Sequence, residues 1–143
     1  KKIKTSLRDG IEINNLTSFR IDKKFFTGVA KKVLKGENKE TSLSIAFVGK
    51  EEITKLNKKF RKKNKPTDVL SFGLNGQDYL GEVVICPDIV KKNAKEYKVS
   101  IKQEISKMLV HGILHLLGHK HEKSKKEALL MEKKQDFYLS KIF

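Results

Sequence analysis

The stretch SIKQEISKMLVHGILHLLGHKH (100–121) has the most distinctive pattern in this chain of 143 residues. Its apolar residues wrap more than half of a helix, which indicates a helix buried in the centre of the fold. Ser100 and Gln103 form the capping-box pattern that begins a helix, and Gly118 is a natural left-handed residue to end one. The apolar positions are Ile101, Ile105, Met108, Leu109, Ile113, Leu116 and Leu117.

All four histidines of the chain lie in the second half of this stretch, HGILHLLGHKH (111–121). His111 and His115 are four residues apart, so both imidazoles leave the same face of a helix. A sharp turn at Gly118 lets His121 return over that face as a third ligand. Three neutral imidazoles leave the fourth tetrahedral position open, which is the ligand count of a catalytic zinc site. The sequence therefore predicts one Zn²⁺ ion on a hydrolase, with nickel or manganese as alternatives.

His119 is the competing ligand, because it follows His115 by four residues. It would face the metal if the helix continued, but Gly118 favours an end to the helix before it. His119 is then expected to support the ligands from behind, to face the substrate, or simply to be exposed. The alternative for any one of these histidines is a hydrogen-bonded residue of the core.

The spacing H-x3-H-x2-G-x2-H matches the metzincin zinc proteases at its histidines and its glycine. The general base of those proteases is the glutamate directly after the first histidine, and Gly112 stands there in this chain. Peptide hydrolysis by that mechanism loses its base without a carboxylate. Met131 has helical spacing with Ala128 and Leu130, which predicts a core residue rather than a Met-turn. A peptidase is therefore disfavoured.

The other periodic segments predict an α+β fold, in which a small mixed sheet of about four strands packs with about five helices around the central histidine-bearing helix. The Asn75-Gly76 pair favours a hairpin between the last two strands. No repeat or linker interrupts the chain, so we expect a single zinc-dependent hydrolase domain over residues 1–143. Strands are expected at 11–13, 43–48, 69–72 and 80–86, and helices at 23–36, 51–61, 87–97, 101–118 and 125–140.

The composition is strongly basic, with 32 Lys and Arg against 17 Asp and Glu and a formal net charge of +15. Such a charge attracts polyanions, of which nucleic acid is the usual one. A lysine-rich surface shaped by genome composition explains the charge equally well, because the lysines are spread along the chain. The single Cys86, the absence of a signal-peptide pattern and the lack of an apolar run of roughly 18 residues predict a cytoplasmic protein without a membrane span.

Two blocks of the sequence together resemble the YbeY family of bacterial rRNA-processing metalloproteins. The first is HGILHLLGHKH (111–121), and the second is LNKKFRKKNKPTDVLSFG (56–73), in which an arginine precedes PTDVLSF. The strand GEVVICPD (81–88) and the C-terminal helix with Met131 are also similar to the family. The resemblance covers most of the chain from Leu43 onward.

The resemblance implies a single-strand-specific endoribonuclease that matures rRNA, notably at the 3′ end of 16S rRNA, and that takes part in ribosome quality control. It implies zinc at His111, His115 and His121 and RNA as partner, either as rRNA or in ribosomal particles. Arg61 matches the family's functionally important arginine, and it could hold a phosphate through paired hydrogen bonds.

The chain departs from the family pattern after Gly118, where His119-Lys120 replaces the usual tyrosine-aspartate. An aspartate there could orient a ligand imidazole or help to activate water, whereas Lys120 could only contact a phosphate. Asp68 could also support the site, although a structural role is favoured. The nucleophile and the general base stay open. So do two other functions, a metal-dependent hydrolase of another substrate and a non-catalytic ribosome-assembly factor.

Overall fold

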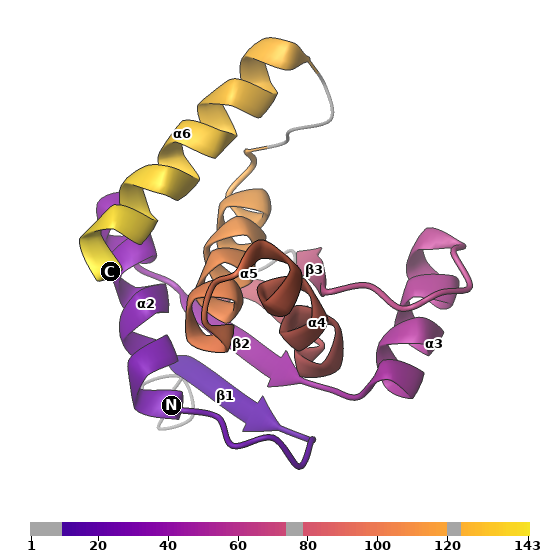
Figure 1. Cartoon of the computed structure of the whole chain (residues 1–143). Helices are drawn as coiled ribbons and strands as arrows, with labels where there is room; N and C mark the ends of the chain where they lie inside the picture. The colour runs from indigo at the N-terminus through magenta and orange to yellow at the C-terminus, as the bar shows by residue number, and fades with distance from the viewer. Residues whose placement is uncertain (1–9, 74–78, 120–123) are drawn as a thin grey trace, which may run out of the picture.

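The computed structural model describes residues 10–73, 79–119 and 124–143 (Figure 1). Within these ranges a four-stranded mixed sheet packs with five helices, which confirms the predicted α+β fold. The strand order is β1-β2-β4-β3, with β1, β2 and β4 parallel to one another and β3 antiparallel to β4. The strands are β1 (Ile11–Asn15), β2 (Ser42–Phe47), β3 (Val69–Gly73) and β4 (Tyr79–Ile85), and the helices are α2 (Lys23–Gly36), α3 (Lys50–Arg61), α4 (Pro87–Tyr97), α5 (Ile101–Leu116) and α6 (Lys125–Ile142).

Strand β2 is buried along its whole length, as predicted for a central strand. Successive side chains of a strand point to opposite faces of the sheet, so β2 contributes to two separate cores. Leu43 and Phe47 belong to the larger core, which α2, α5 and α6 cover, whereas Ala46 belongs to a smaller core under α3. Helices α5 and α3 therefore lie on opposite faces of the sheet, and Figure 1 shows α3 standing apart from the other helices.

Side-chain caps mark the starts of α2, α5 and α6. The Asp22 carboxylate accepts a hydrogen bond from the backbone N–H of Phe25 (3.1 Å), and the Ser124 hydroxyl accepts one from Glu127 (3.1 Å). At the start of α5 the capping box is complete, because Ser100 and Gln103 each bind the other's backbone N–H. These side chains satisfy N–H groups that have no partner within the helix, which fixes where each helix begins.

Helix α2 ends at Gly36 as predicted, although this glycine is not the left-handed residue of the turn. The left-handed residue of this turn is Asn38 (φ 59°), not Gly36. A Cβ atom at Gly36 would collide with the phenol ring of Tyr138 from α6. The glycine therefore lets α6 approach α2 closely.

The core prediction for Met131 is confirmed, and the single cysteine is buried as well. Met131 is 2% exposed and belongs to the larger core, as expected for a packing residue rather than a Met-turn. Cys86 is fully buried, and this burial raises the pKa of its thiol. The predicted hairpin turn at Asn75-Gly76 lies outside the described residues. Among the described helices none is both long and apolar enough to cross a membrane.

Candidate metal centre

Helix α5 presents His111 and His115 side by side. Their rings are nearly parallel, with an interplanar angle of 27° and a centroid separation of 6.3 Å. Both residues are half-buried at the C-terminal end of the helix. The structure thus brings together the first two predicted ligands on one helix face, as their spacing required.

Gln135 of α6 is a hydrogen-bond partner of the His111 ring. The Nδ1 atom of His111 lies 3.1 Å from the side-chain oxygen Oε1 of Gln135, which is itself buried. With the amide oxygen as the acceptor of this hydrogen bond, Nδ1 is the donor and carries the proton. The lone pair then resides on Nε2, which is the form of imidazole that binds a metal. The donor set present in α5 therefore fits zinc.

Sequence reasoning did not find Gln135. The sequence signal for Gln135 is weak: it shares a helical spacing with the buried residues Met131 and Tyr138 of α6. A polar residue within such a stripe needs a hydrogen-bond partner in the interior. That need could have marked Gln135 as the partner of a histidine, but no local pattern identifies which one.

The chain leaves the axis of α5 at Gly118, as predicted. Gly118 has a left-handed backbone (φ 102°), and its N–H donates to the carbonyl of His115 (3.1 Å). The N–H of His119 donates to the carbonyl of Leu114 (3.0 Å), which completes the Schellman pattern of a helix end. His119 therefore does not follow His115 on a continuing helix.

His119 is held by Glu37, the residue that follows α2. Its Nε2 atom lies 3.1 Å from Oε1 of Glu37, so the expectation that His119 is simply exposed is wrong. Lys134 donates to both carboxylate oxygens (3.0 and 2.9 Å), and the Tyr138 hydroxyl donates to Oε2. Burial raises the pKa of Glu37, but the hydrogen bonds from Tyr138, Lys134 and His119 outweigh it and hold this pKa below its usual value.

Lys120 and His121 lie outside the described residues, so the third ligand and the role of the lysine stay predictions. In the ranges 10–73, 79–119 and 124–143, no three His, Cys, Asp or Glu side chains gather closely enough to hold a metal ion. A three-ligand site on α5 therefore needs a ligand from outside these ranges.

Gly112 faces the sheet rather than the histidine site. A Cβ atom there would lie 2.8 Å from Cγ1 of Val83 and 3.1 Å from the hydroxyl of Ser71. Ser71 of β3 donates a hydrogen bond to the Gly112 carbonyl (3.2 Å), so helix and strand are in close contact. A glutamate at this position would have no room, which accounts for the missing metzincin base.

Arg61 is exposed at the C-terminal end of α3, in the layer opposite α5. The edge strand β3 contacts helix α3 with one face and helix α5 with the other. Phe60 packs edge-on against Phe72 (centroids 4.9 Å apart), while the neighbouring Ser71 points the other way and binds Gly112. The structure thus places the end of α3, with Arg61, against one face of β3 and the histidine-bearing helix α5 against the other face.

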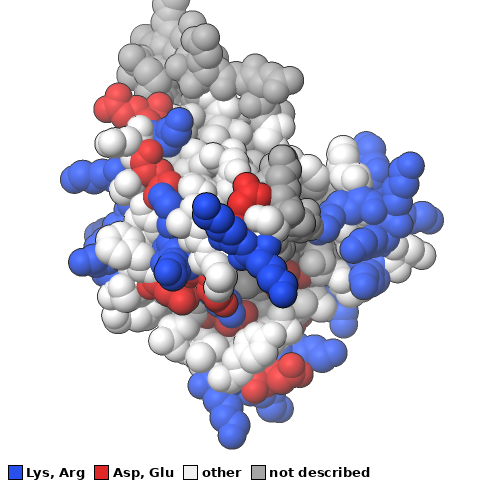
Figure 2. Space-filling view, turned by 90° about the horizontal axis from the view of Figure 1, so that it is seen from above, with Lys and Arg blue, Asp and Glu red and all other residues white. Residues whose placement is uncertain are grey.

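Arg61 belongs to a cluster of exposed cations that we call the α3 basic surface. Figure 2 shows Lys and Arg side chains gathered on this side of the molecule, at the right of the view. Its members are Lys50, Lys55, Lys58, Lys59, Arg61, Lys62, Lys63 and Lys65.

Asp68 is tied to α4 at the start of β3. Its carboxylate accepts hydrogen bonds from Thr67 and from the amide of Asn93 (3.4 Å each), and its carbonyl accepts one from Cys86 (2.9 Å). These contacts match the structural role favoured from the sequence.

Comparison with known proteins identifies the family of this chain. The family model described as "Endoribonuclease YbeY" matches residues 12–143. The chain belongs to the YbeY family. A Bdellovibrio bacteriovorus relative named Endoribonuclease YbeY is 47% identical over 106 residues, covering 74% of this chain and 71% of the relative. A Thermotoga maritima relative of the same name is 37% identical over 111 residues, covering 78% and 74%.

A solved structure shares the YbeY-family fold. The solution structure of a Thermotoga maritima protein superposes with a TM-score of 0.68 at 32% identity. The match covers 92% of this chain and 87% of that chain. The α+β architecture described above is therefore the architecture of this neighbour as well.

Proposed function

We propose that this chain is a single-strand-specific, zinc-dependent endoribonuclease. It acts in the cytoplasm on rRNA, at the 3′ end of 16S rRNA, and in ribosome quality control. The endoribonuclease activity is supported by membership of a family whose matching relatives are named endoribonucleases. One structural observation supports the zinc dependence: His111 and His115 share a helix face, and Gln135 is hydrogen-bonded to Nδ1 of His111, which leaves Nε2 for a metal.

Three imidazoles are proposed to hold the metal, from His111, His115 and His121. When bound, a zinc ion supplies Lewis acidity toward a phosphoryl oxygen and toward water. The chain's own task is to present neutral imidazoles at fixed positions. Gln135 orients the His111 ring through the hydrogen bond that its Oε1 atom accepts from Nδ1.

Arg61 and the α3 basic surface are proposed to bind the RNA backbone. A guanidinium offers paired donors to a phosphate and stays charged at all relevant pH values. The surrounding lysines add a positive field without sequence preference, which suits single-stranded RNA of varied sequence. The edge strand β3 runs between this surface and α5, so RNA that crosses it can reach the histidines.

The residue at position 112 argues against a peptidase of the metzincin type. The close approach of α5 to Val83 leaves no space for a side chain there, and the base of the metzincin mechanism therefore has no counterpart. Casein hydrolysis that a zinc chelator abolishes would revive this alternative.

Cleavage of single-stranded RNA tests the proposal. We expect the purified protein to cut single strands and to spare duplexes of the same sequence. His115→Ala and Arg61→Ala should lose most of this activity, whereas Arg20→Ala, an exposed arginine between β1 and α2, should retain it. Equal cleavage by all these variants would trace the activity to a contaminating nuclease.

Metal analysis tests the zinc site separately. Protein purified without chelators should contain about one zinc per chain, and His121→Ala should lose it. Wild-type protein without stoichiometric metal would overturn the zinc proposal. Binding to ribosomal particles that survives Arg61→Ala, without any RNA cleavage, would favour a non-catalytic assembly factor instead.

A further inference from the structure

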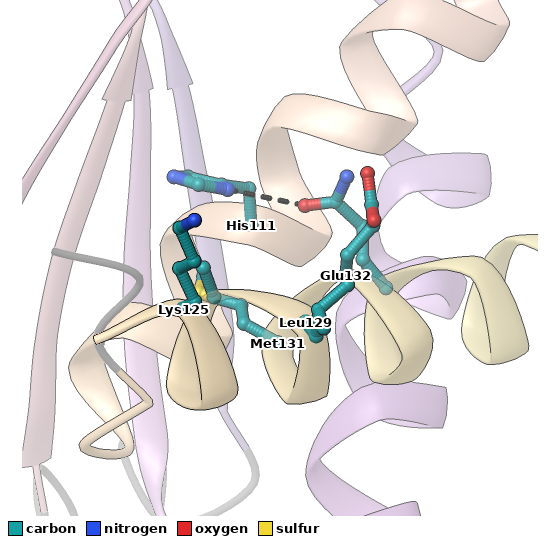
Figure 3. A pocket seen from close by; sticks show the side chains of 7 residues that line it. His111, Lys125, Leu129, Met131 and Glu132 are labelled. Carbon is teal, nitrogen blue, oxygen red and sulfur yellow. Dashed lines mark hydrogen bonds between the residues drawn. The ribbon is translucent and has the colours of Figure 1, made fainter. Parts of the chain in front are cut away.

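A pocket of about 520 Å³ lies beside His111, between α5 and the first half of α6 (Figure 3). Helix α6 supplies most of its wall, with Ala128, Leu129 and Met131 as the apolar part. Lys125 and Glu132 supply the charged groups. The volume is within the ordinary range for a small-molecule site, roughly 300–1,000 Å³.

The pocket is polar at its two ends and apolar between them. Lys125 and Glu132 are two helical turns apart, about 10 Å along the axis of α6. Figure 3 shows the Lys125 side chain reaching toward the His111 ring, while Glu132 lies further along the helix. A ligand that lies along α6 therefore meets the ammonium of Lys125, then apolar side chains, then the carboxylate of Glu132, and His111 lines the same pocket.

We propose that this pocket holds one unstacked nucleotide of the RNA, with its phosphate at Lys125 and its base against Ala128 and Leu129. The proposal rests on the proposed function and adds a substrate-binding subsite to it. A phosphate at Lys125 would lie next to the candidate metal ligand His111, as a phosphate near the cleavage position must.

The chemistry of the pocket favours a nucleotide over a peptide or a lipid. The ammonium of a lysine is a compact charge that suits a phosphate. The apolar wall provides contact for a base without reading its sequence. A base can enter only when it is neither paired nor stacked, so the pocket supplies a physical reason for a preference for single strands.

The carboxylate of Glu132 gives the pocket a preference among the RNA bases. A carboxylate at neutral pH accepts hydrogen bonds and donates none. It therefore favours a base whose edge carries an amino group, as cytosine does at N4, over uracil, which has a carbonyl oxygen at the same position. We expect the pocket to prefer cytidine to uridine.

Two pairs of neighbouring residues test the subsite. Lys125 and Leu129 line the pocket, whereas Lys126 and Leu130 do not. Leu129 and Leu130 are similarly exposed, at 57% and 51%, so their truncation disturbs the fold equally little. We measure the binding of a short single-stranded RNA at several salt concentrations, and we record melting temperatures as a check on folding.

Lys125→Ala should weaken RNA binding severalfold and should reduce the slope of log K against log salt by about 0.7, as expected for one lost phosphate contact. Leu129→Ala should weaken binding about five- to tenfold, by loss of apolar contact with the base. Lys126→Ala and Leu130→Ala should bind like the wild type. Equal effects within each pair would overturn the subsite.

Short oligocytidylate and oligouridylate test the role of Glu132. The wild type should bind oligocytidylate more tightly, and Glu132→Gln should lose this preference because an amide both donates and accepts. Glu127→Gln, an acid of the same helix outside the pocket, should keep it. Wild-type protein that discriminates no better than Glu132→Gln contradicts the assignment.

The outcomes separate this proposal from the proposed function. RNA that the wild type binds and cleaves, with no difference between pocket variants and their controls, removes the subsite and leaves the nuclease. A wild type that neither binds nor cleaves RNA removes both.

Discussion

At position 135 one amide oxygen is the hydrogen-bond partner of Nδ1 of His111. We expect Gln135→Leu to lower zinc affinity about 10- to 100-fold, because the ring loses the partner that orients it. Gln135→Glu keeps an acceptor at the same place and should retain the affinity. Competition with a chromophoric zinc chelator measures this, and melting of the metal-free proteins reports on folding. Zinc binding by the leucine variant equal to that of the wild type would show that Gln135 does not position the ligand.

Two glycines with opposite surroundings give a second prediction for single residues. Gly112→Ala should destabilise the protein by about 1–3 kcal/mol, because the new methyl group overlaps Val83. Gly28→Ala in α2 meets no atom within 4 Å and should stabilise by roughly 0.5–1 kcal/mol through higher helix propensity. Urea unfolding of both variants measures the difference. A neutral Gly112→Ala would show that α5 can move away from the sheet without cost.

Between elements, Glu37 joins the end of α2 to α6 and to the turn after α5. Its pKa is lowered in the folded protein, so the carboxylate stabilises the fold above its ordinary pKa of 4.5. This contribution is lost as the pH falls through the lower, folded value. Glu37→Gln should therefore cost about 1–3 kcal/mol at pH 7, and its melting temperature should fall less on acidification than that of the wild type. Parallel melting curves from pH 7 to acid would contradict this.

Glu104 of α5 should behave in the opposite way. Burial raises its pKa, and Asp68 adds to this while Lys107 opposes it. The folded protein therefore binds this proton more tightly than the unfolded chain, and stability falls as the pH rises from 4.5 through the raised value. Glu104→Gln should raise the melting temperature at pH 7, whereas Glu96→Gln at an exposed position should not. Thermal melts over a pH series measure this, and a lower melting temperature for Glu104→Gln would contradict it.

The elements and their ends could be predicted because their signals are local. The caps of α2 and α5, the left-handed turn at Gly118 and the central position of β2 all follow from patterns within a few residues. The partners of the site could not be predicted, because they join distant parts of the chain. Gln135 is 24 residues from His111, and Glu37 is 82 residues from His119.

At the scale of the whole molecule, the sheet separates the proposed metal site on α5 from the α3 basic surface. His111 and His115 lie in the α5 layer and Arg61 lies in the α3 layer, with β3 between them. The net charge of +15 alone does not explain RNA binding, because lysines also cover elements far from α3. The affinity for RNA depends on which of these cations contacts a phosphate.

Two variants with equal charge separate local contacts from the overall field. One replaces four lysines of the α3 basic surface by alanine, and the other replaces four exposed lysines of α2, which lies at the opposite side of the molecule in Figure 1. The α3 set is Lys55, Lys58, Lys59 and Lys63, and the α2 set is Lys23, Lys24, Lys31 and Lys32.

Both variants lower the net charge by four, so a purely long-range attraction predicts the same loss of affinity for single-stranded RNA. Direct contact predicts a difference, because each phosphate contact that is lost reduces the slope of log K against log salt by about 0.7. We expect the α3 variant to lose affinity and slope, and the α2 variant to keep the wild-type slope. Equal slopes in the two variants would mean that RNA does not lie on the α3 basic surface.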